Sequence, residues 1–358
     1  IGSRQGIEIK GAKGEGDNID TGGDTIEGEG DNNNVGVSKS KIGNDEIEID
    51  YKGKFAMYYA RILFFSFLTD SQVKSLQEII SCIEKSQNNV RIASNLNLDN
   101  KILSLFEKHI NPFVLSELDY KIHNINTLAN DTSLSPILRA SNAMKKFSRL
   151  SDSEIVTPET VTEKIINGLP SKAINKSTLF LDIASKQGEF VYALFKIYGK
   201  EIANNFYSIP TSKIAYEFTR KVYKLLGLNI DNIESKFSSY DLIKENTLIK
   251  NGSLKFNNKK MKFDVIVGNP PYQQTISSNS KNKSLSRQIF PDFIYLTLSL
   301  NPKYLSLVTP SRWFTGDAQD KSFLKLREFF KNNNKIESIV NMPISSSVFP
   351  DVEISGGI

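Results

Sequence analysis

The sequence predicts an α/β protein with a doubly wound, mainly parallel sheet, incomplete at its carboxyl end and preceded by a helical region. Strand-like apolar segments alternate with helix-like periodic segments across residues 175–345. Residues 264–268 have the β-branched hydrophobicity typical of a strand buried on both faces. Pro270 and Pro271 follow, and they prevent both further strand pairing and immediate entry into a helix.

Five strands and five helices are expected between residues 160 and 340. The strands are residues 178–184, 205–209, 264–268, 304–308 and 336–340. The helices are residues 160–168, 190–198, 215–226, 294–300 and 320–330. The first of these helices has a clear start signal, since Thr157 is a favoured N-cap residue and Pro158 suits the first helical position.

Composition divides the chain further. Residues 1–50 hold 12 acidic and 5 basic side chains, 11 of the 21 glycines and no aromatic residue, so we expect them to be disordered. Because residues 1–50 are acidic and the overall charge is +5, residues 51–358 are basic, which suits a polyanionic partner. Residues 51–150 are expected to form a helical connector, with three-four spacing over 72–85, 98–109 and, less clearly, 119–129. Residues 151–358 would form the sheet domain.

Cysteine and histidine are scarce. The single cysteine, Cys82, excludes a disulfide framework, and His109 and His123 are too few for a metal site of the Cys and His type. We therefore expect no metal and a reducing, cytoplasmic location. Residues 55–68 are aromatic-rich but too short and too charged to span a bilayer.

The residues that follow the buried strand at 264–268 can bind an amino group through hydrogen bonds. Asn269 lies at the carboxyl end of that strand, where parallel sheets bind ligands. The side-chain oxygen of Asn269 and the carbonyl oxygen of Pro270 can accept both hydrogens of one planar NH₂ group. Tyr272 offers a flat face for an aromatic ring. This arrangement would aim the nitrogen lone pair at an electrophile, so the implied reaction is methylation of an amino nitrogen.

The tetrapeptide Asn269, Pro270, Pro271 and Tyr272 resembles the catalytic motif of S-adenosylmethionine-dependent N6-adenine DNA methyltransferases, in the form found in large type II restriction-modification fusion proteins. The resemblance runs from about Ser151 to the last residue. It implies a methyltransferase sheet, S-adenosylmethionine as cofactor, and double-stranded DNA with a flipped adenine as substrate.

The same resemblance assigns six residues to the cofactor. They are Thr157 and Pro158 at its methionine end, Asp182 at its ammonium group, Gly188 where the backbone approaches it, and Asp241 and Phe293 at its adenine. A solvated surface role for Asp241 and a core role for Phe293 remain equally open on the residues alone.

Two departures from the family pattern concern this cofactor pocket. The loop after the first strand has only one glycine, Gly188, beside the bulkier Lys186 and Gln187. The second strand ends without the acidic residue that holds the ribose hydroxyls in the family. The substitutes in the sequence are Ser208, Thr211, Ser212 and Glu217.

Contacts to DNA are expected from two segments. Lys281, Lys283 and Arg287 lie in a long polar loop that can meet phosphates. Arg312 is a phosphate candidate, and Trp313 either stacks on the flipped base or belongs to the core.

The residues around 141–150 and 182–190 also resemble a subgroup in which a nuclease and a helicase precede the methyltransferase in one chain. The missing strands and a target-recognition domain would then follow Ile358. Two alternatives remain: methylation of a glutamine amide or an RNA amino group, and a scaffold that reads DNA without methylating it.

Overall fold

The computed structural model describes residues 51–151, 154–245, 247–275, 286–316, 321–333, 335–349, 354 and 357–358. The expected disorder of residues 1–50 therefore concerns residues outside this description. The described residues divide into two compact units, one ending at Asn130 and the other beginning at Asp131.

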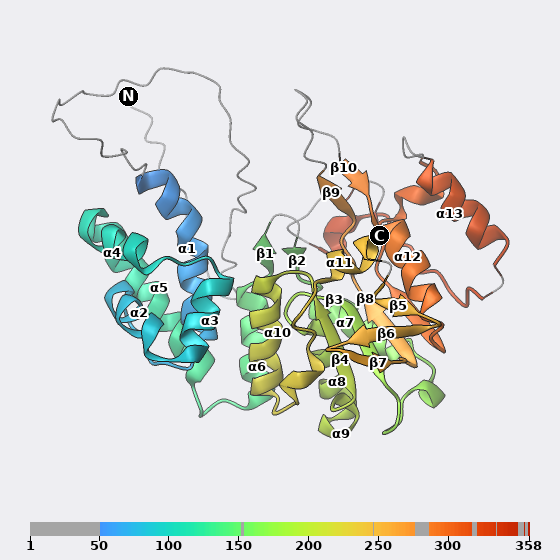
Figure 1. Cartoon of the computed structure of the whole chain (residues 1–358), viewed down its shortest axis with the longest axis horizontal. Helices are drawn as coiled ribbons and strands as arrows, with labels where there is room; N and C mark the ends of the chain where they lie inside the picture. The colour runs from blue at the N-terminus through green and yellow to red at the C-terminus, as the bar shows by residue number, and fades with distance from the viewer. Residues whose placement is uncertain are drawn as a thin grey trace, which may run out of the picture. The chain divides into compact units, whose positions relative to one another are not determined.

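The helical unit contains α1 (Tyr51–Leu68), α2 (Leu76–Cys82), α3 (Gln87–Asn95), α4 (Asn100–His109) and α5 (Pro112–Asn130). These helices run from blue to teal in Figure 1. Ser75, Ser86 and Asp99 begin α2, α3 and α4 as N-caps whose side chains accept backbone hydrogen bonds. The core is rich in buried phenylalanines: Phe64, Phe65, Phe67 and Phe106. No helix in the described residues is long and apolar enough to cross a membrane.

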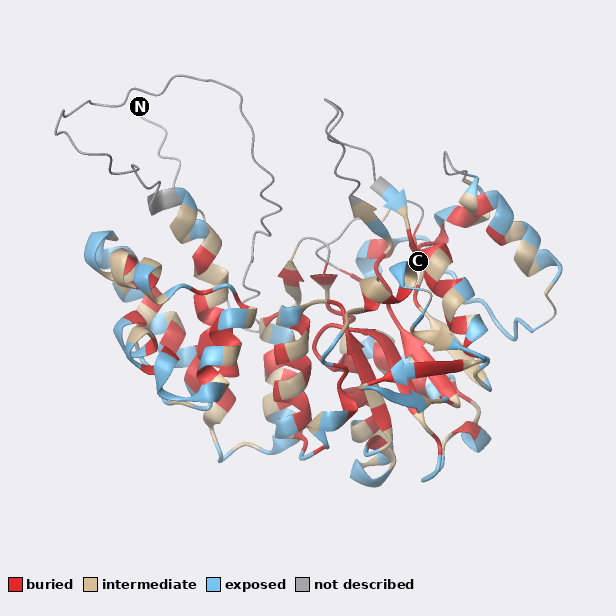
Figure 2. Cartoon of the chain, viewed as in Figure 1, coloured by how far each residue is buried: buried red, intermediate tan, exposed pale blue. Residues whose placement is uncertain are grey.

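The second unit is organised around a parallel sheet. Its strand order is β11 (Tyr304–Leu307), β8 (Val265–Gly268), β3 (Phe180–Ser185) and β4 (Phe206–Pro210). A parallel bridge between Ser208 and Ile233 continues the pairing beyond β4. Strands β3 and β8 are buried along their whole length (Figure 2), and for β8 the apolar run at residues 264–268 predicted this burial.

Helices cover both faces of this sheet. They are α6 (Pro136–Lys146), α7 (Glu159–Asn167), α8 (Glu189–Tyr198), α9 (Lys200–Ala203), α10 (Lys213–Leu225), α11 (Ser239–Lys244), α12 (Phe290–Ser299) and α13 (Ser322–Lys331). Phe180 and Val265 pack with residues of α8 and α10, whereas their neighbours Leu181 and Ile266 pack with residues of α11 and α12. The predicted doubly wound α/β fold is confirmed.

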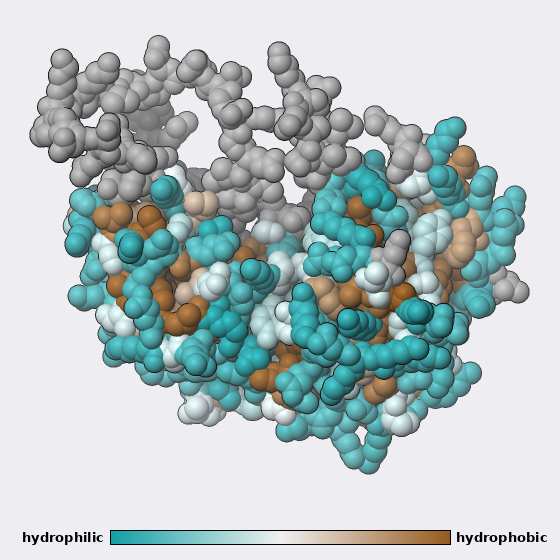
Figure 3. Space-filling view, in the orientation of Figure 1, coloured by the Kyte–Doolittle hydropathy of each residue, from teal (hydrophilic) through white to brown (hydrophobic). Residues whose placement is uncertain are grey.

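Three small antiparallel pieces complete the unit. They are β1 (Arg149–Ser151) with β2 (Glu154–Ile155), β5 (Ile249–Lys250) with β6 (Ser253–Phe256) and β7 (Lys259–Met261), and β9 (Gln273–Thr275) with β10 (Ser286–Gln288). The surface over β5–β7 is hydrophilic in Figure 3, where Lys255, Lys259 and Lys260 are exposed.

Two local predictions were wrong. Residues 336–340 form no strand, and Ile339 and Val340 are 55% and 74% exposed. This segment has no neighbouring strand to pair with in the described part of the chain, so its apolar and β-branched residues alone do not produce a ladder. Thr157 is not the N-cap of α7, since Pro158 takes that position without a side-chain hydrogen bond. The hydroxyl of Thr157 instead bonds to residues distant in sequence.

Candidate active site

The candidate site lies at the carboxyl ends of β3, β4 and β8. The chain passes from β3 to β4 on one side of the sheet and later adds β8 on the other side of β3. Such a reversal leaves a crevice between strand ends, which is where open parallel sheets bind ligands. Asp182 in β3 pairs in register with Val267 in β8, two residues before Asn269. The structure thus brings these two predicted site residues to adjacent strand ends.

Asn269 is 4% exposed and is held from two sides. Its side-chain Nδ2 donates to Thr157 Oγ1 over 3.1 Å, and its backbone oxygen accepts from Lys186 Nζ over 2.7 Å. Its side-chain oxygen Oδ1 is buried and has no hydrogen-bond partner among the described residues. A buried acceptor without a donor is costly, so this oxygen is suited to a donor from a ligand.

A chain of hydrogen bonds fixes which way the Asn269 amide faces. Thr157 Oγ1 lies 3.4 Å from Glu189 Oε1, and an ionised carboxylate can only accept, so the Thr157 hydroxyl donates to Glu189. That hydroxyl oxygen must then accept from Asn269, which requires the NH₂ side of the amide. Glu189 therefore acts through Thr157 to leave Oδ1 as an acceptor facing the site.

Lys186 connects the loop after β3 to the loop after β8. The Lys186 side chain is 3% exposed and is influenced by the carboxylates of Glu189, Asp182 and Glu154. Burial lowers the pKa of Lys186, although these three carboxylates oppose the shift. The sequence indicated only that Lys186 was bulky for a cofactor loop, not that its ammonium group would hold the backbone of Asn269.

Asp182 is fully buried and carries a second unpartnered acceptor. Its Oδ1 accepts from Ala184 N over 3.0 Å, while its Oδ2 has no partner among the described residues. Burial, reinforced by the charge of Glu189, raises the pKa of Asp182 well above its usual range. Gly268 allows close strand packing here, because a Cβ at this position would lie 2.8 Å from Ile183 Cγ2.

The loop between β3 and α8 has its own support. Glu189 Oε2 accepts from the backbone N of Lys186 over 3.3 Å and of Gln187 over 2.9 Å. Gly188 has a φ of 77°, a conformation that favours glycine, and its N donates to Ser185 Oγ over 3.0 Å. Gln187 Nε2 donates to the backbone oxygen of Phe147. One glycine is thus enough for this turn, because neighbouring side chains satisfy the other backbone groups.

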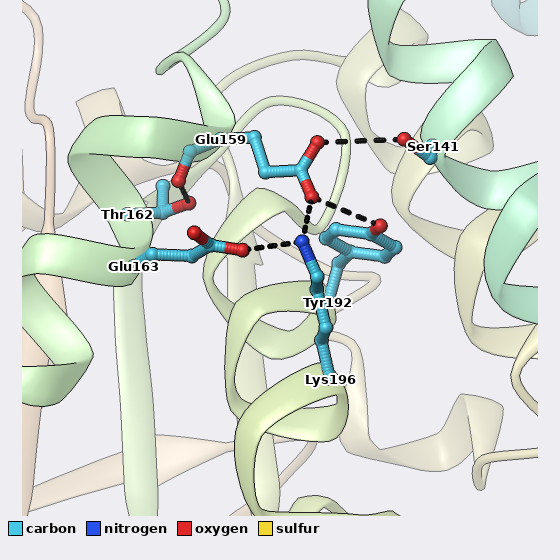
Figure 4. Close-up of polar contacts among 6 residues, drawn as sticks. All are labelled: Ser141, Glu159, Thr162, Glu163, Tyr192 and Lys196. Atoms are coloured by element: carbon cyan, nitrogen blue, oxygen red, sulfur yellow. Dashed lines mark hydrogen bonds and ion pairs between the residues drawn. The ribbon is translucent and has the colours of Figure 1, made fainter.

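The start of α7 is anchored by Glu159 (Figure 4). The Glu159 carboxylate accepts from Lys196 Nζ over 2.6 Å, from Tyr192 OH over 3.2 Å and from Ser141 Oγ over 3.4 Å. Burial alone would raise the pKa of Glu159, but Lys196 and Tyr192 hold it below the usual value. The side chain of Glu159 is thus engaged with α8 and α6, and the first amides of α7, beside Pro158, form a helix N-terminus suited to an anion.

Aromatic residues form a second part of the site. Tyr272 is half-buried against an apolar cluster of Phe290, Ile294, Trp313, Phe323 and Leu326. Burial raises the pKa of the Tyr272 phenol, whose oxygen has no partner among the described residues. Trp313 is 8% exposed within this cluster, so of the two alternatives the structure shows the core position.

The structure gives other predicted residues different surroundings. Asp241 Oδ2 accepts from Ser238 N and Oγ, both over 2.8 Å, as part of the capping box that begins α11. Phe293 is completely buried in the core between the sheet and α12. Both residues therefore have a structural role, and their contact with a cofactor stays a prediction.

The predicted DNA contacts are only partly described. Arg312 is exposed and its guanidinium lies 5.7 Å from the ring centre of Phe323. Arg287 forms an ion pair with Asp292 over 2.8 Å. Lys281 and Lys283 lie outside the described residues. Within the described ranges, no group of three or more His, Cys, Asp or Glu residues could hold a metal ion.

Replacing Lys186 by methionine tests the electrostatics of the site. This change leaves the buried carboxylates without their nearby cation, so we expect the free energy of unfolding to fall by roughly 3 kcal/mol at neutral pH. The loss should shrink as the pH falls through the raised pKa of Asp182, because protonation removes the charge of that carboxylate. Urea unfolding followed by fluorescence of Trp313, the chain's single tryptophan, reports on this unit.

Lys176→Met is the matched control. The side chain of Lys176 is 71% exposed and pairs with Glu201 at the surface, so its loss should change stability little. An Lys186→Met variant as stable as the control at neutral pH would contradict this account of the cluster.

The chain is similar to methyltransferases of restriction-modification systems. A family model described as Eco57I restriction-modification methylase matches residues 171–349. A curated protein from Mycoplasma pneumoniae, described as an uncharacterized adenine-specific methylase, is 39% identical over 125 residues, which are 35% of this chain and 29% of that protein. The match thus spans less than a third of this relative's length.

Two solved structures are also similar. A type I restriction-modification system methyltransferase subunit from Streptococcus thermophilus aligns with a TM-score of 0.45 and 12% identity, over 77% of this chain and 64% of that chain. The type IIG restriction endonuclease BpuSI aligns with a TM-score of 0.36 and 14% identity, over 79% of this chain and 34% of that chain. The family match extends over half of the sequence and includes the Asn269 loop. This chain belongs to the Eco57I restriction-modification methylase family.

Proposed function

We propose that this protein is an adenine-specific DNA methyltransferase that transfers a methyl group from S-adenosylmethionine to N6 of a flipped adenine. The observation that carries the proposal is the buried Oδ1 of Asn269, which has no partner among the described residues and is fixed as an acceptor by Thr157 and Glu189. Family membership and the adenine-specific relative support the same activity.

The residues at the ends of β3 and β8 fit a cofactor with excess positive charge. The Oδ2 of Asp182 has no hydrogen-bond partner among the described residues, and three carboxylates, those of Glu189, Asp182 and Glu154, act on Lys186. A ligand ammonium group would offset part of the cost of burying them. The first amides of α7, beside Pro158, suit a carboxylate, and the turn at Gly188 allows close backbone approach. When bound, S-adenosylmethionine supplies a methyl group on a sulfonium, which needs no further activation.

The residues at 269–272 would prepare the amino group of adenine. Asn269 Oδ1 and the carbonyl oxygen of Pro270 would accept its two hydrogens and draw them aside. This removes the nitrogen lone pair from conjugation and directs it toward the methyl group. Tyr272, with Pro271 before it, would place a flat face against the ring. These residues act by orientation and polarisation, so no separate general base is required before attack.

Double-stranded DNA is the proposed substrate and partner. The family name and the basic character of residues 51–358 support a nucleic acid, and Arg312 and Arg287 are placed on the surface of the sheet unit. Lys281 and Lys283 would add phosphate contacts, and linked nuclease or helicase modules in a longer chain are part of the proposal. Comparing methyl incorporation into DNA, RNA and protein separates this function from methylation of RNA or glutamine.

Replacing Asn269 by alanine tests the proposed polarisation. The variant loses the oriented acceptor but keeps Asp182 and the loop at Gly188, so we expect cofactor affinity within about threefold of wild type. Methyl transfer should fall by roughly two to three orders of magnitude, as when an oxyanion-type hydrogen bond is removed. Tritiated-methyl incorporation and calorimetric titration measure the two effects.

Asn124→Ala provides the matched control for this test. Asn124 is exposed on α5, in the helical unit, and the same truncation there should change neither quantity. Near-wild-type methyl transfer by Asn269→Ala would contradict the proposed function.

The affinity for S-adenosylmethionine should rise with pH. In the free protein the pKa of Asp182 is raised by burial, and a bound ammonium group favours the ionised carboxylate and lowers that pKa. Binding should therefore release protons, and affinity should increase with pH between the pKa of Asp182 in the complex and its raised pKa in the free protein.

Titration calorimetry in two buffers of different ionisation enthalpy measures this proton release. The Asp182→Asn variant should release fewer protons on binding, and any protons that it still releases would come from Lys186. Proton uptake on binding by the wild-type protein would contradict the assigned role of Asp182.

A further inference from the structure

We propose that Glu154 is the carboxylate that binds the ribose hydroxyls of the cofactor. This inference rests on the proposed function, because it assigns one part of the same ligand. It also explains how the ribose could be held although β4, the second strand, does not end in the acidic residue that the family pattern has there.

The structure brings Glu154 to that strand end from upstream in the chain. Thr211 Oγ1 donates to Glu154 Oε1, and Ser212 Oγ donates to Glu154 Oε2 over 3.1 Å. Thr211 and Ser212 follow directly after β4, whereas Glu154 begins β2, a strand before the sheet. The carboxylate therefore lies where a side chain of the second strand would have placed it, although it is 57 residues away in sequence.

Glu154 is buried and forms no ion pair within the part of the chain that the structure describes. It is 6% exposed, and its hydrogen-bond donors in the described part of the chain are the hydroxyls of Thr211, Ser212 and Ser151. Burying a carboxylate without a directly paired cation is costly, and hydroxyls offset only part of that cost. The cost is explained if the carboxylate serves a ligand. Each carboxylate oxygen has two acceptor positions, so Oε1 keeps one position beyond the Thr211 contact.

The position of Glu154 also matches the rest of the site. Thr211 N donates to Ser185 O over 3.0 Å, which joins the end of β4 to the loop at Gly188. The carboxylate of Glu154 is close enough to Lys186 for its negative charge to favour the protonated lysine, as the carboxylate of Asp182 also does. A ligand that extends from Asp182 past Gly188 toward β4 would bring its hydroxyls to Glu154. Two vicinal hydroxyls are the donors that a carboxylate accepts in pairs.

The other residues considered for the ribose fit less well. Ser208 is fully buried and exchanges a hydrogen bond with Tyr223 OH inside the core. Glu217 is 2% exposed in α10 and has other contacts. Thr211 and Ser212 themselves are already bonded to Glu154, which indicates that they position the carboxylate rather than replace it.

A purely structural role, in which Glu154 only ties β2 to β4, makes a different prediction about the ligand. If Glu154 binds ribose, the effects of removing the carboxylate and of removing a ribose hydroxyl must depend on each other. If it is only a structural tie, the two effects are independent and should multiply.

The test uses the whole 358-residue chain and titration calorimetry with S-adenosylhomocysteine and its 2′-deoxy and 3′-deoxy derivatives. For the wild type, we expect removal of a bound hydroxyl to weaken affinity by about tenfold to a hundredfold, typical of a hydrogen bond to a charged group. Glu154→Gln should weaken the parent compound to a similar degree, and a deoxy derivative should then lose little more. Glu201→Gln, an exposed surface change, should behave as wild type.

The outcomes separate this inference from the proposed function. A wild type that binds the parent and both deoxy compounds equally, or a Glu154→Gln variant that still loses tenfold with the deoxy compounds, overturns the role of Glu154 alone. A wild type that binds no S-adenosylhomocysteine overturns the proposed function and this inference together. If Glu154→Gln fails to fold by circular dichroism, Glu154→Asp and the wild-type comparison of parent with deoxy compounds decide the question.

Discussion

The candidate site depends on the hydrogen-bond chain from Glu189 through Thr157 to Asn269. An amide side chain has one donor end and one acceptor end, and only the acceptor end can polarise an amino group. Glu189 forces the Thr157 hydroxyl to donate toward it, and Thr157 in turn accepts from the Asn269 amide. The same Glu189 carboxylate supports the backbone of the loop between β3 and α8, the proposed cofactor loop. One side chain therefore sets the geometry of both halves of the proposed reaction.

Electrostatics gives the site a second constraint. Glu154, Asp182 and Glu189 are buried and their charges act on the buried Lys186, so these three carboxylates outnumber that lysine at the strand ends. Such an arrangement is unfavourable in isolation and becomes favourable with a cationic ligand. Lys186 limits the cost and holds the backbone of Asn269 in the same contact. The bulky loop that departs from the family's glycine-rich pattern thus has a physical explanation.

The sequence predicted the features that depend on local pattern. A buried strand ended by two prolines placed Asn269, and the strand-turn-helix pattern placed Asp182 and Gly188, because parallel strands present their carboxyl ends on one edge. Contacts between segments distant in the chain could not be predicted from the sequence. Thr157 has the local character of an N-cap, but its tertiary partner Asn269 is 112 residues away. The prediction of a strand at residues 336–340 was wrong for a related reason. A strand needs a neighbouring strand to pair with, and the residues of the segment itself do not show whether one is present.

The most direct test of this account compares Thr157→Val with Thr157→Ser in single-turnover methylation of adenine-containing duplex DNA. Valine keeps the shape of threonine but removes the hydroxyl, so the Asn269 amide loses its fixed orientation while Asn269 itself is unchanged. The account predicts a methyl-transfer rate at least tenfold lower for Thr157→Val and close to wild type for Thr157→Ser, with N6-methyladenine as the product by mass spectrometry. Equal rates for the two variants, or methylation at any other atom, would contradict it.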